Sequence, residues 1–166
     1  LATMLIFLQG LLYLLRQGAG AEYQNILGGE LQSCSQNGMA LTGFTRTGYC
    51  VDQVDDEGSH HICINLKSTA SSGNFCEVTG QSDWCSEGDM PCHQNKNAQV
   101  CEPENWCVCQ WAFASYIQKA GGCSAIQDIQ CDAVNMEALK AYEKNLSDDK
   151  IKDAYDCLYE RCLVSS

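Results

Sequence analysis

The sequence has few basic residues. Ten lysines and arginines stand against 21 aspartates and glutamates, which gives a net charge of −11, and no run of basic residues occurs. Proteins that bind nucleic acid or anionic lipid use clustered basic side chains to contact phosphates. The composition therefore argues against both of these partner classes and favours a soluble, acidic surface.

The sequence also lacks the C-x-x-C pair that is typical of zinc sites. Structural zinc sites generally use two such pairs, or cysteine and histidine at similar spacings. We therefore expect no bound metal and no cofactor.

Cysteine itself is abundant, with 13 in a chain of 166 residues. This density is typical of domains cross-linked by disulfides in an oxidising, extracytoplasmic compartment. Because 13 is odd, one thiol is left unpaired or pairs with another chain, and the connectivity cannot be read from the sequence. The disulfide candidates are Cys34, Cys50, Cys63, Cys76, Cys85, Cys92, Cys101, Cys107, Cys109, Cys123, Cys131, Cys157 and Cys162.

The N-terminal residues 1–15 are almost wholly apolar and lead through Arg16 to a stretch of small residues that ends at Ala21. Fifteen helical residues span about 22 Å, less than the ~30 Å hydrocarbon core of a bilayer, which favours a cleaved signal peptide. A retained apolar helix must instead be buried in lipid or against a partner. We expect a hydrophobic anchor at 1–21, with the signal segment as the alternative, and a single cysteine-rich domain at 22–166.

The remaining sequence predicts an α+β domain with a few short strands and about three helices. Strands are expected at 41–50, 61–66 and 124–130, where aromatic and β-branched residues lie between turn signals. Residues 67–105 show no periodicity. We expect disulfides from the four cysteines of that segment to order it.

Three segments predict helices. Residues 106–120 contain no helix breaker and are followed by Gly121-Gly122, so a buried helix is expected there. Asn135 is a suitable N-cap for a helix at 136–144, and Ser147 for a final helix. In that final helix Ile151, Ala154, Tyr155, Leu158 and Cys162 recur at helical spacing, so one face is expected to be buried.

Several short motifs, in order along the chain, resemble the family known as domain of unknown function 2237. They are 25–29 with Cys34, 41–44 with Arg46, Gly48 and Cys50, Asp56 with 58–60 and Cys63, 72–74, 106–109 with Trp111, and 132–134 with Leu139. The resemblance implies a small α+β domain of bacterial type and no particular reaction. This chain differs by its N-terminal hydrophobic segment, a cysteine-rich insert after Asn74 and an added helix beyond Tyr142.

The resemblance also divides the cysteines. Five fall on family-like positions: Cys34, Cys50, Cys63, Cys107 and Cys109. The other eight are an even number, so four added disulfides could account for them. The unpaired thiol would then belong to the five family-like positions.

The best candidate for catalysis is the segment 55–63, which contains Asp56, His60 and Cys63. A general base needs a histidine held by an acceptor and directed at a nucleophile. The alternative is a turn before a strand, in which Asp56 and Ser59 bond to backbone groups. We favour the turn and assign no catalytic residue.

Residues 106–116 offer two further sites. In a helix the side chains of Cys107 and Cys109 would point about 200° apart and could not share a metal ion. On a strand they would share a face and could bind a metal together with His60 or His61. The helix prediction therefore argues against metal.

The four aromatic residues of this segment, Trp106, Trp111, Phe113 and Tyr116, are expected to pack in the core rather than to form a ligand pocket.

These features predict a non-catalytic accessory subunit. Its hydrophobic segment 1–15 would hold it to a membrane or membrane-protein complex, and its domain would dock on that complex from the lumenal or extracellular side. A photosynthetic complex facing the thylakoid lumen is one such setting, and a secretory or extracellular one is another. One alternative is a thiol-redox or hydrolytic enzyme that uses His60 with Cys63 or Cys107. Another is a freely secreted binding protein, and Asn145 begins an N-glycosylation motif, Asn-Leu-Ser.

Overall fold

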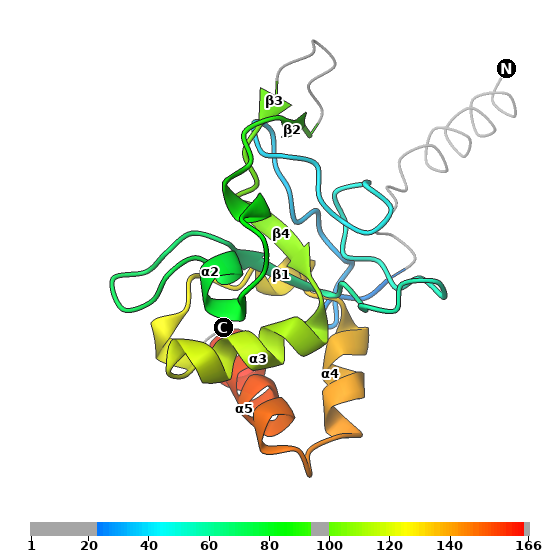
Figure 1. Ribbon diagram of the computed structural model, residues 1–166. Coiled ribbons are helices and arrows are strands. Elements are labelled where there is room, and N and C mark those ends of the chain that lie inside the picture. Colours follow the sequence, from blue (N-terminus) through cyan, green and yellow to red (C-terminus); the bar gives the residue numbers. More distant parts are fainter. Residues whose placement is uncertain (1–22, 94–99, 165–166) are drawn as a thin grey trace, which may run out of the picture.

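The computed structural model describes residues 23–93 and 100–164. Within these ranges the fold is α+β, as predicted, with short antiparallel strands on one side and helices on the other (Figure 1). The hydrophobic helix expected at 1–21 lies outside the described residues. Among the residues that are described, none of the helices combines the length and the apolar character needed to cross a membrane.

The central strand pair joins β1 (Ile62–Asn65) to β4 (Asn105–Val108) in an antiparallel arrangement, with Cys63 opposite Cys107. The strand predicted at 61–66 is confirmed. The helix predicted at 106–120 is wrong in its first part, because β4 precedes α3 (Gln110–Ala120). The stretch Trp-Cys-Val has high strand propensity, and pairing with β1 decides its conformation although no helix breaker is present.

The helical side consists of α3, α4 (Met136–Glu143) and α5 (Asp149–Leu158), which pack together beneath the strands (Figure 1). Asn135 caps α4 as predicted, since its side chain accepts a hydrogen bond from the backbone N–H of Glu137. The cap of α5 is Asp148 and not Ser147. A carboxylate at this position accepts two backbone N–H bonds and also interacts favourably with the positive end of the helix dipole.

Beyond α5 the chain continues as a π-helix, η4 (Tyr159–Val164). Apolar side chains from these helices and the central strands form one core. Its largest wholly buried members include Phe75, Phe113, Tyr116, Tyr142 and Leu158.

The segment 67–105 contains more regular structure than the sequence predicts. It forms α2 (Phe75–Thr79), a 3-10 turn η1 (Trp84–Ser86), and the strand pair β2 (Met90–Pro91) and β3 (Val100–Cys101). Asn74 and Glu77 close a capping box on α2. As expected, two disulfides cross-link the segment, Cys76–Cys85 and Cys92–Cys101.

Two of the predicted strands are wrong. Residues 41–50 form an irregular loop, because Gly43, Arg46 and Gly48 have φ angles of 92°, 53° and 89°, which a strand cannot contain. The segment 124–130 contributes only an isolated bridge between Ile129 and Ile64. The 3-10 turns η2 (Cys123–Ala125) and η3 (Cys131–Ala133) occupy its flanks.

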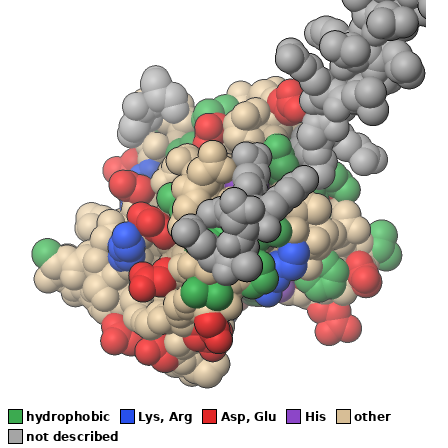
Figure 2. All heavy atoms as spheres, turned by 90° about the horizontal axis from the view of Figure 1, so that it is seen from above, with side chains coloured by type: hydrophobic (Ala, Val, Ile, Leu, Met, Phe, Trp, Pro, Cys, Tyr) green, Lys and Arg blue, Asp and Glu red, His purple; other side chains and the backbone are tan. Residues whose placement is uncertain are grey.

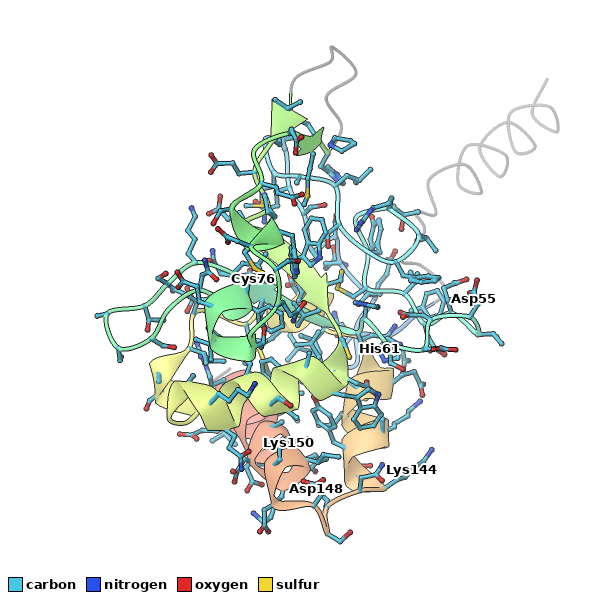
Figure 3. All side chains as sticks on the ribbon, in the orientation of Figure 1. Asp55, His61, Cys76, Lys144, Asp148 and Lys150 are labelled. Atoms are coloured by element: carbon cyan, nitrogen blue, oxygen red, sulfur yellow. A yellow bond between two sulfur atoms is a disulfide. The ribbon has the colours of Figure 1, made fainter. Side chains whose placement is uncertain are left out.

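Six disulfides cross-link the described residues (Figure 3). The eight cysteines outside the family-like positions form four of them: Cys76–Cys85, Cys92–Cys101, Cys123–Cys157 and Cys131–Cys162. The family-like positions supply Cys34–Cys63 and Cys50–Cys107 and leave Cys109 unpaired. This is the division that the sequence suggested, and so many disulfides fit an extracytoplasmic location.

Candidate functional site

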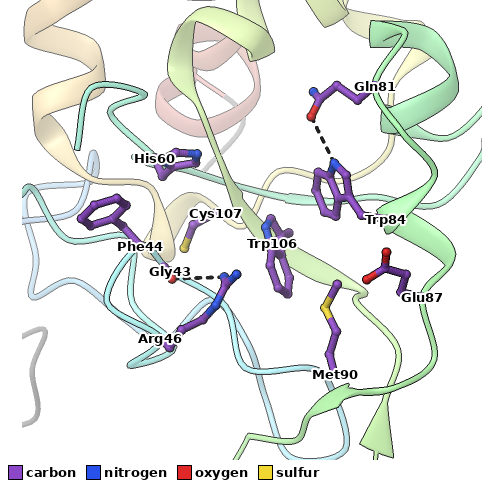
Figure 4. A pocket seen from close by; sticks show the side chains of 10 residues that line it. All are labelled: Gly43, Phe44, Arg46, His60, Gln81, Trp84, Glu87, Met90, Trp106 and Cys107. Carbon is purple, nitrogen blue, oxygen red and sulfur yellow. Dashed lines mark hydrogen bonds between the residues drawn. The ribbon is translucent and has the colours of Figure 1, made fainter. Parts of the chain in front are cut away.

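A groove of about 570 Å³ lies where the loop 43–60 faces the edge of β4 and the cysteine-rich insert (Figure 4). Its size is within the range of small-molecule sites. Polar, charged and aromatic side chains all line it. The lining residues are Gly43, Phe44, Arg46, His60, Gln81, Trp84, Glu87, Met90, Trp106 and Cys107.

Arg46 is held by a tight turn. The turn closes through a 3.0 Å hydrogen bond from the Arg46 N–H to the Gly43 carbonyl, and the Arg46 side chain bonds to the same carbonyl through Nη1 at 3.3 Å. The guanidinium carbon lies 5.0 Å from the centre of the Trp106 ring, a cation–π distance. One guanidinium N–H is thus used to fix the side chain, and the others remain available to a ligand.

The turn depends on Gly43. Its φ of 92° is in the left-handed region, and a Cβ there would lie 2.5 Å from the Tyr49 carbonyl oxygen. Only glycine fits both conditions. Arg46 itself has a φ of 53°, which lies in the left-handed region that non-glycine residues seldom adopt.

His60 is the second polar group of the groove, and Asp56 holds it. The two oxygens of Asp56 accept from the backbone N–H of His60 at 2.8 Å and contact its Nδ1 at 2.7 Å. The Asp56 side chain is 1% exposed and that of His60 36% exposed. His60 Nδ1 therefore carries a proton and donates it to the Asp56 carboxylate. His60 Nε2 has no hydrogen-bond partner among the described residues.

The conformation around His60 is also constrained. The Phe44 ring stacks on the imidazole with a centroid distance of 6.3 Å and an interplanar angle of 18°. Ser59, directly before His60, has a φ of 47°. Arg46 and Ser59 are the two non-glycine residues with positive φ in the described ranges, and both set the position of a groove side chain.

Burial would raise the pKa of Asp56, but hydrogen bonds from the backbone and ring of His60 outweigh it and lower that pKa below its ordinary value of 3.8. A carboxyl with a lowered folded pKa stabilises the folded state above its ordinary pKa. This stabilisation is lost as the pH falls through the folded value.

We therefore expect Asp56→Asn to lower the free energy of unfolding at pH 7 by about 2 kcal/mol, the scale of hydrogen bonds to a charged group. The difference between variant and native protein should shrink as the pH falls below 3.8. Urea unfolding at a series of pH values measures it. The exposed neighbour Asp55 provides the control, and Asp55→Asn should leave the curve almost unchanged. A constant gap between Asp56→Asn and native protein across this range would contradict the assignment.

The opposite wall of the groove comes from the insert. Trp84 lies on η1, and its indole N–H donates to Gln81 Oε1 at 3.1 Å. Its ring packs at 5.6 Å from that of Trp106. The Cys76–Cys85 disulfide fixes η1 against α2 and so supports this wall.

The structure brings together two of the three catalytic candidates and separates the third. Asp56 and His60 form a pair, and they do so within a turn before β1, which is the interpretation that the sequence favours for this segment. Cys63 is 0% exposed and bonded to Cys34, and Cys107 is bonded to Cys50. Neither sulfur is a free nucleophile in this state.

The residues of the alternative metal site, Cys107 and Cys109 with His60 or His61, do not share a site either. Residues 107 and 108 are in a strand, but the disulfide of Cys107 removes it from any shared site with Cys109. His61 is buried, with Nδ1 at 3.0 Å from Gln110 Oε1 and Nε2 at 3.0 Å from Asp52 Oδ1. His61 is therefore a structural residue.

The aromatic residues of 106–116 have different positions. Phe113 and Tyr116 are wholly buried in the core, as expected, and Trp111 packs on Tyr142. Trp106 is buried to 7% exposure but presents part of its ring to the groove. Sequence reasoning missed Arg46 and Trp84, whose local sequence carries no signal of a site.

Asn145 lies on the turn between α4 and α5, where it and its neighbours Leu146 and Ser147 are exposed. Its side-chain amide donates to the Ala141 carbonyl at 2.8 Å. The motif is thus accessible, and its use as a glycosylation site stays a prediction.

Comparison with known proteins gives one family. The family model described as "Uncharacterized protein conserved in bacteria (DUF2237)" matches residues 24–147. No curated protein matches the chain. The match covers the groove, the turn of Arg46 and the Asp56–His60 pair.

Proposed function

This chain belongs to the DUF2237 family, and we propose that it is a binding protein for a small anionic ligand with an aromatic body, held in the groove between Arg46, His60 and the two tryptophans. One observation carries the proposal. The two non-glycine residues with positive φ in the described ranges, Arg46 and Ser59, position two polar side chains of the same groove, those of Arg46 itself and of His60. Backbone strain of this kind concentrates at functional sites.

Arg46 is the side chain of the groove that suits a carboxylate, and Glu87 is the one acidic residue among those that line it. A guanidinium presents a planar pair of donors that matches a carboxylate, and Arg46 is already oriented by Trp106 and the Gly43 carbonyl. His60 Nε2 adds a second polar atom. The chain has a net charge of −11 and as a whole repels anions. Binding of a carboxylate would therefore depend on these local groups.

The apolar part of the ligand would contact the rings of Trp84, Trp106 and Phe44. Ring-on-ring contacts of this kind contribute about 0.5–1.5 kcal/mol beyond the burial of area. Among the residues that line the groove there is no serine, threonine, lysine or unpaired cysteine. The described groove therefore supports binding better than covalent catalysis.

The test compares two probes of equal size, benzoate and neutral benzyl alcohol, by quenching of tryptophan fluorescence. Native protein should bind benzoate more tightly, and Arg46→Gln should weaken benzoate binding about tenfold, or about 1.4 kcal/mol, with little effect on benzyl alcohol. Lys67→Gln is the matched control, because it removes one positive charge from the exposed Lys67–Glu104 pair outside the groove. Equal affinity of native protein and Arg46→Gln for benzoate would refute the proposal.

Docking on a larger assembly is a second proposal. It is supported by large apolar side chains that are exposed on the loops before β1, namely Leu27, Phe44 and Val54 at 46%, 43% and 109% exposure. In the view from above in Figure 2, the visible hydrophobic side chains form small groups scattered among acidic ones. Attachment through residues 1–15, an accessory role in a membrane complex and a thylakoid or secretory location remain predictions.

A further inference from the structure

The two disulfides at the family-like positions form one sulfur cluster. The Sγ atoms of Cys34, Cys50 and Cys63 all lie within 4.8 Å of one another, and Cys107 is bonded to Cys50. Within the described ranges this is the one group of three or more potential metal ligands that comes so close together. The other four disulfides contribute no member to it.

The four cysteines of the cluster come from different parts of the chain and meet in one buried place. Cys63 and Cys107 lie opposite each other on β1 and β4, but each bonds to a loop cysteine and not to its strand partner. Two strands and two loops thus converge on one point. All four cysteines are at most 1% exposed, and the small side chain of Ala133 completes their buried cluster.

The spacing is close to that of a metal centre. In a tetrahedral zinc–thiolate site, metal–sulfur bonds of about 2.3 Å place the sulfurs about 3.8 Å apart. Three of the sulfurs are already within 4.8 Å in the oxidised protein. The fourth sulfur, Cys107 Sγ, is bonded to Cys50 but lies outside this group of three. Closing four sulfurs around an ion would therefore require both disulfides to open and Cys107 Sγ to move toward the other three.

We propose that Cys34, Cys50, Cys63 and Cys107 form a redox-gated site for one Zn²⁺ ion: two disulfides when the chain folds under oxidising conditions, and a tetrathiolate centre when it folds under reducing ones. Each disulfide takes two electrons and two protons from a dithiol, which becomes a disulfide in turn. The four thiols then release four protons as Zn²⁺ binds. The oxidised protein carries no metal at this site, and the site is separate from ligand binding in the groove.

The experiment uses the full chain and Co²⁺, which reports thiolate coordination through its absorption spectrum. The protein is reduced with a phosphine in denaturant, freed of reductant without oxygen, and refolded with equimolar Co²⁺. We expect one Co²⁺ per chain with strong thiolate charge-transfer bands, displaced by Zn²⁺. Treatment with iodoacetamide should then modify the four cysteines of the cluster less in the Zn²⁺ form than in the metal-free reduced form, whereas modification of the other nine should not depend on Zn²⁺, as read by peptide mass mapping.

Two double variants test whether the cluster is the metal site. Cys34→Ser with Cys63→Ser should abolish the tetrathiolate spectrum and the protection. Cys123→Ser with Cys157→Ser removes a comparable disulfide outside the cluster and should keep both. The proposal is overturned if the reduced chain binds no Co²⁺, if the cluster variant binds it as native protein does, or if protection spreads over all cysteines, as in an unfolded chain that captures metal nonspecifically. The peptide map distinguishes these outcomes even if refolding is incomplete.

Discussion

Replacing Cys50 and Cys107 together by alanine is expected to lower the free energy of unfolding by about 4 kcal/mol. This disulfide joins residues 57 positions apart, the longest separation of the six. A longer closed loop removes more conformational entropy from the unfolded chain. Denaturant unfolding of the oxidised proteins measures the loss.

The control is the short loop of Cys76–Cys85, whose partners are nine positions apart. Its removal by two alanines should cost about 2.5 kcal/mol, because the same entropy relation gives a smaller term. Both pairs include a buried cysteine on a regular element, so the comparison isolates loop length. Equal losses in the two variants would mean that the Cys50–Cys107 bond does not constrain the unfolded chain as the topology requires.

The Gly43→Ala variant should lose about 3 kcal/mol of stability and also bind benzoate at least tenfold more weakly. The left-handed backbone costs a non-glycine residue about 1–2 kcal/mol, and forcing the new Cβ away from the Tyr49 carbonyl adds about 1–3 kcal/mol. The distance between these atoms would otherwise be 2.5 Å. Because the turn from Gly43 carries Arg46, its displacement should remove the guanidinium from the groove.

Gly38 supplies the matched control. It has a similar φ of 88°, but a Cβ there would meet nothing within 4 Å. Gly38→Ala should therefore cost about 1–2 kcal/mol from the backbone alone and leave benzoate affinity unchanged. Thermal melts give the stabilities and fluorescence titration gives the affinities. If both glycine variants behave alike, the contact with Tyr49 has no role in holding the turn.

The cysteine pattern shows what the sequence can predict about this fold. The odd count and the even remainder outside the family-like positions led to four added disulfides and one unpaired thiol, and the structure contains that division. The α4 cap at Asn135 was predictable for a similar reason, because a short polar side chain before an apolar run has one favoured use. The cap is a local property of the chain, whereas the division of the cysteines combines their count with what the family resemblance implies.

The groove could not be predicted in this way. Its Arg46 and His60 come from irregular loops whose shape depends on positive φ angles, and its Trp84 comes from the insert. Only the packing of the insert against β4 brings these groups together. The prediction of a helix at Cys107 is wrong for the same reason. The strand there forms by pairing with β1, which is distant in the sequence, and local propensity does not report such a contact.

The most direct test of the proposed function is to map the site at which benzoate binds. In two-dimensional NMR spectra of isotope-labelled native protein, saturating benzoate should shift the indole signals of Trp84 and Trp106 and the backbone amides of Phe44, Arg46 and His60. The amides of the turn between α4 and α5, at the far end of the fold in Figure 1, should not move. Shifts confined to that far end, or spread evenly over the protein without the two indoles, would contradict a ligand site at this groove.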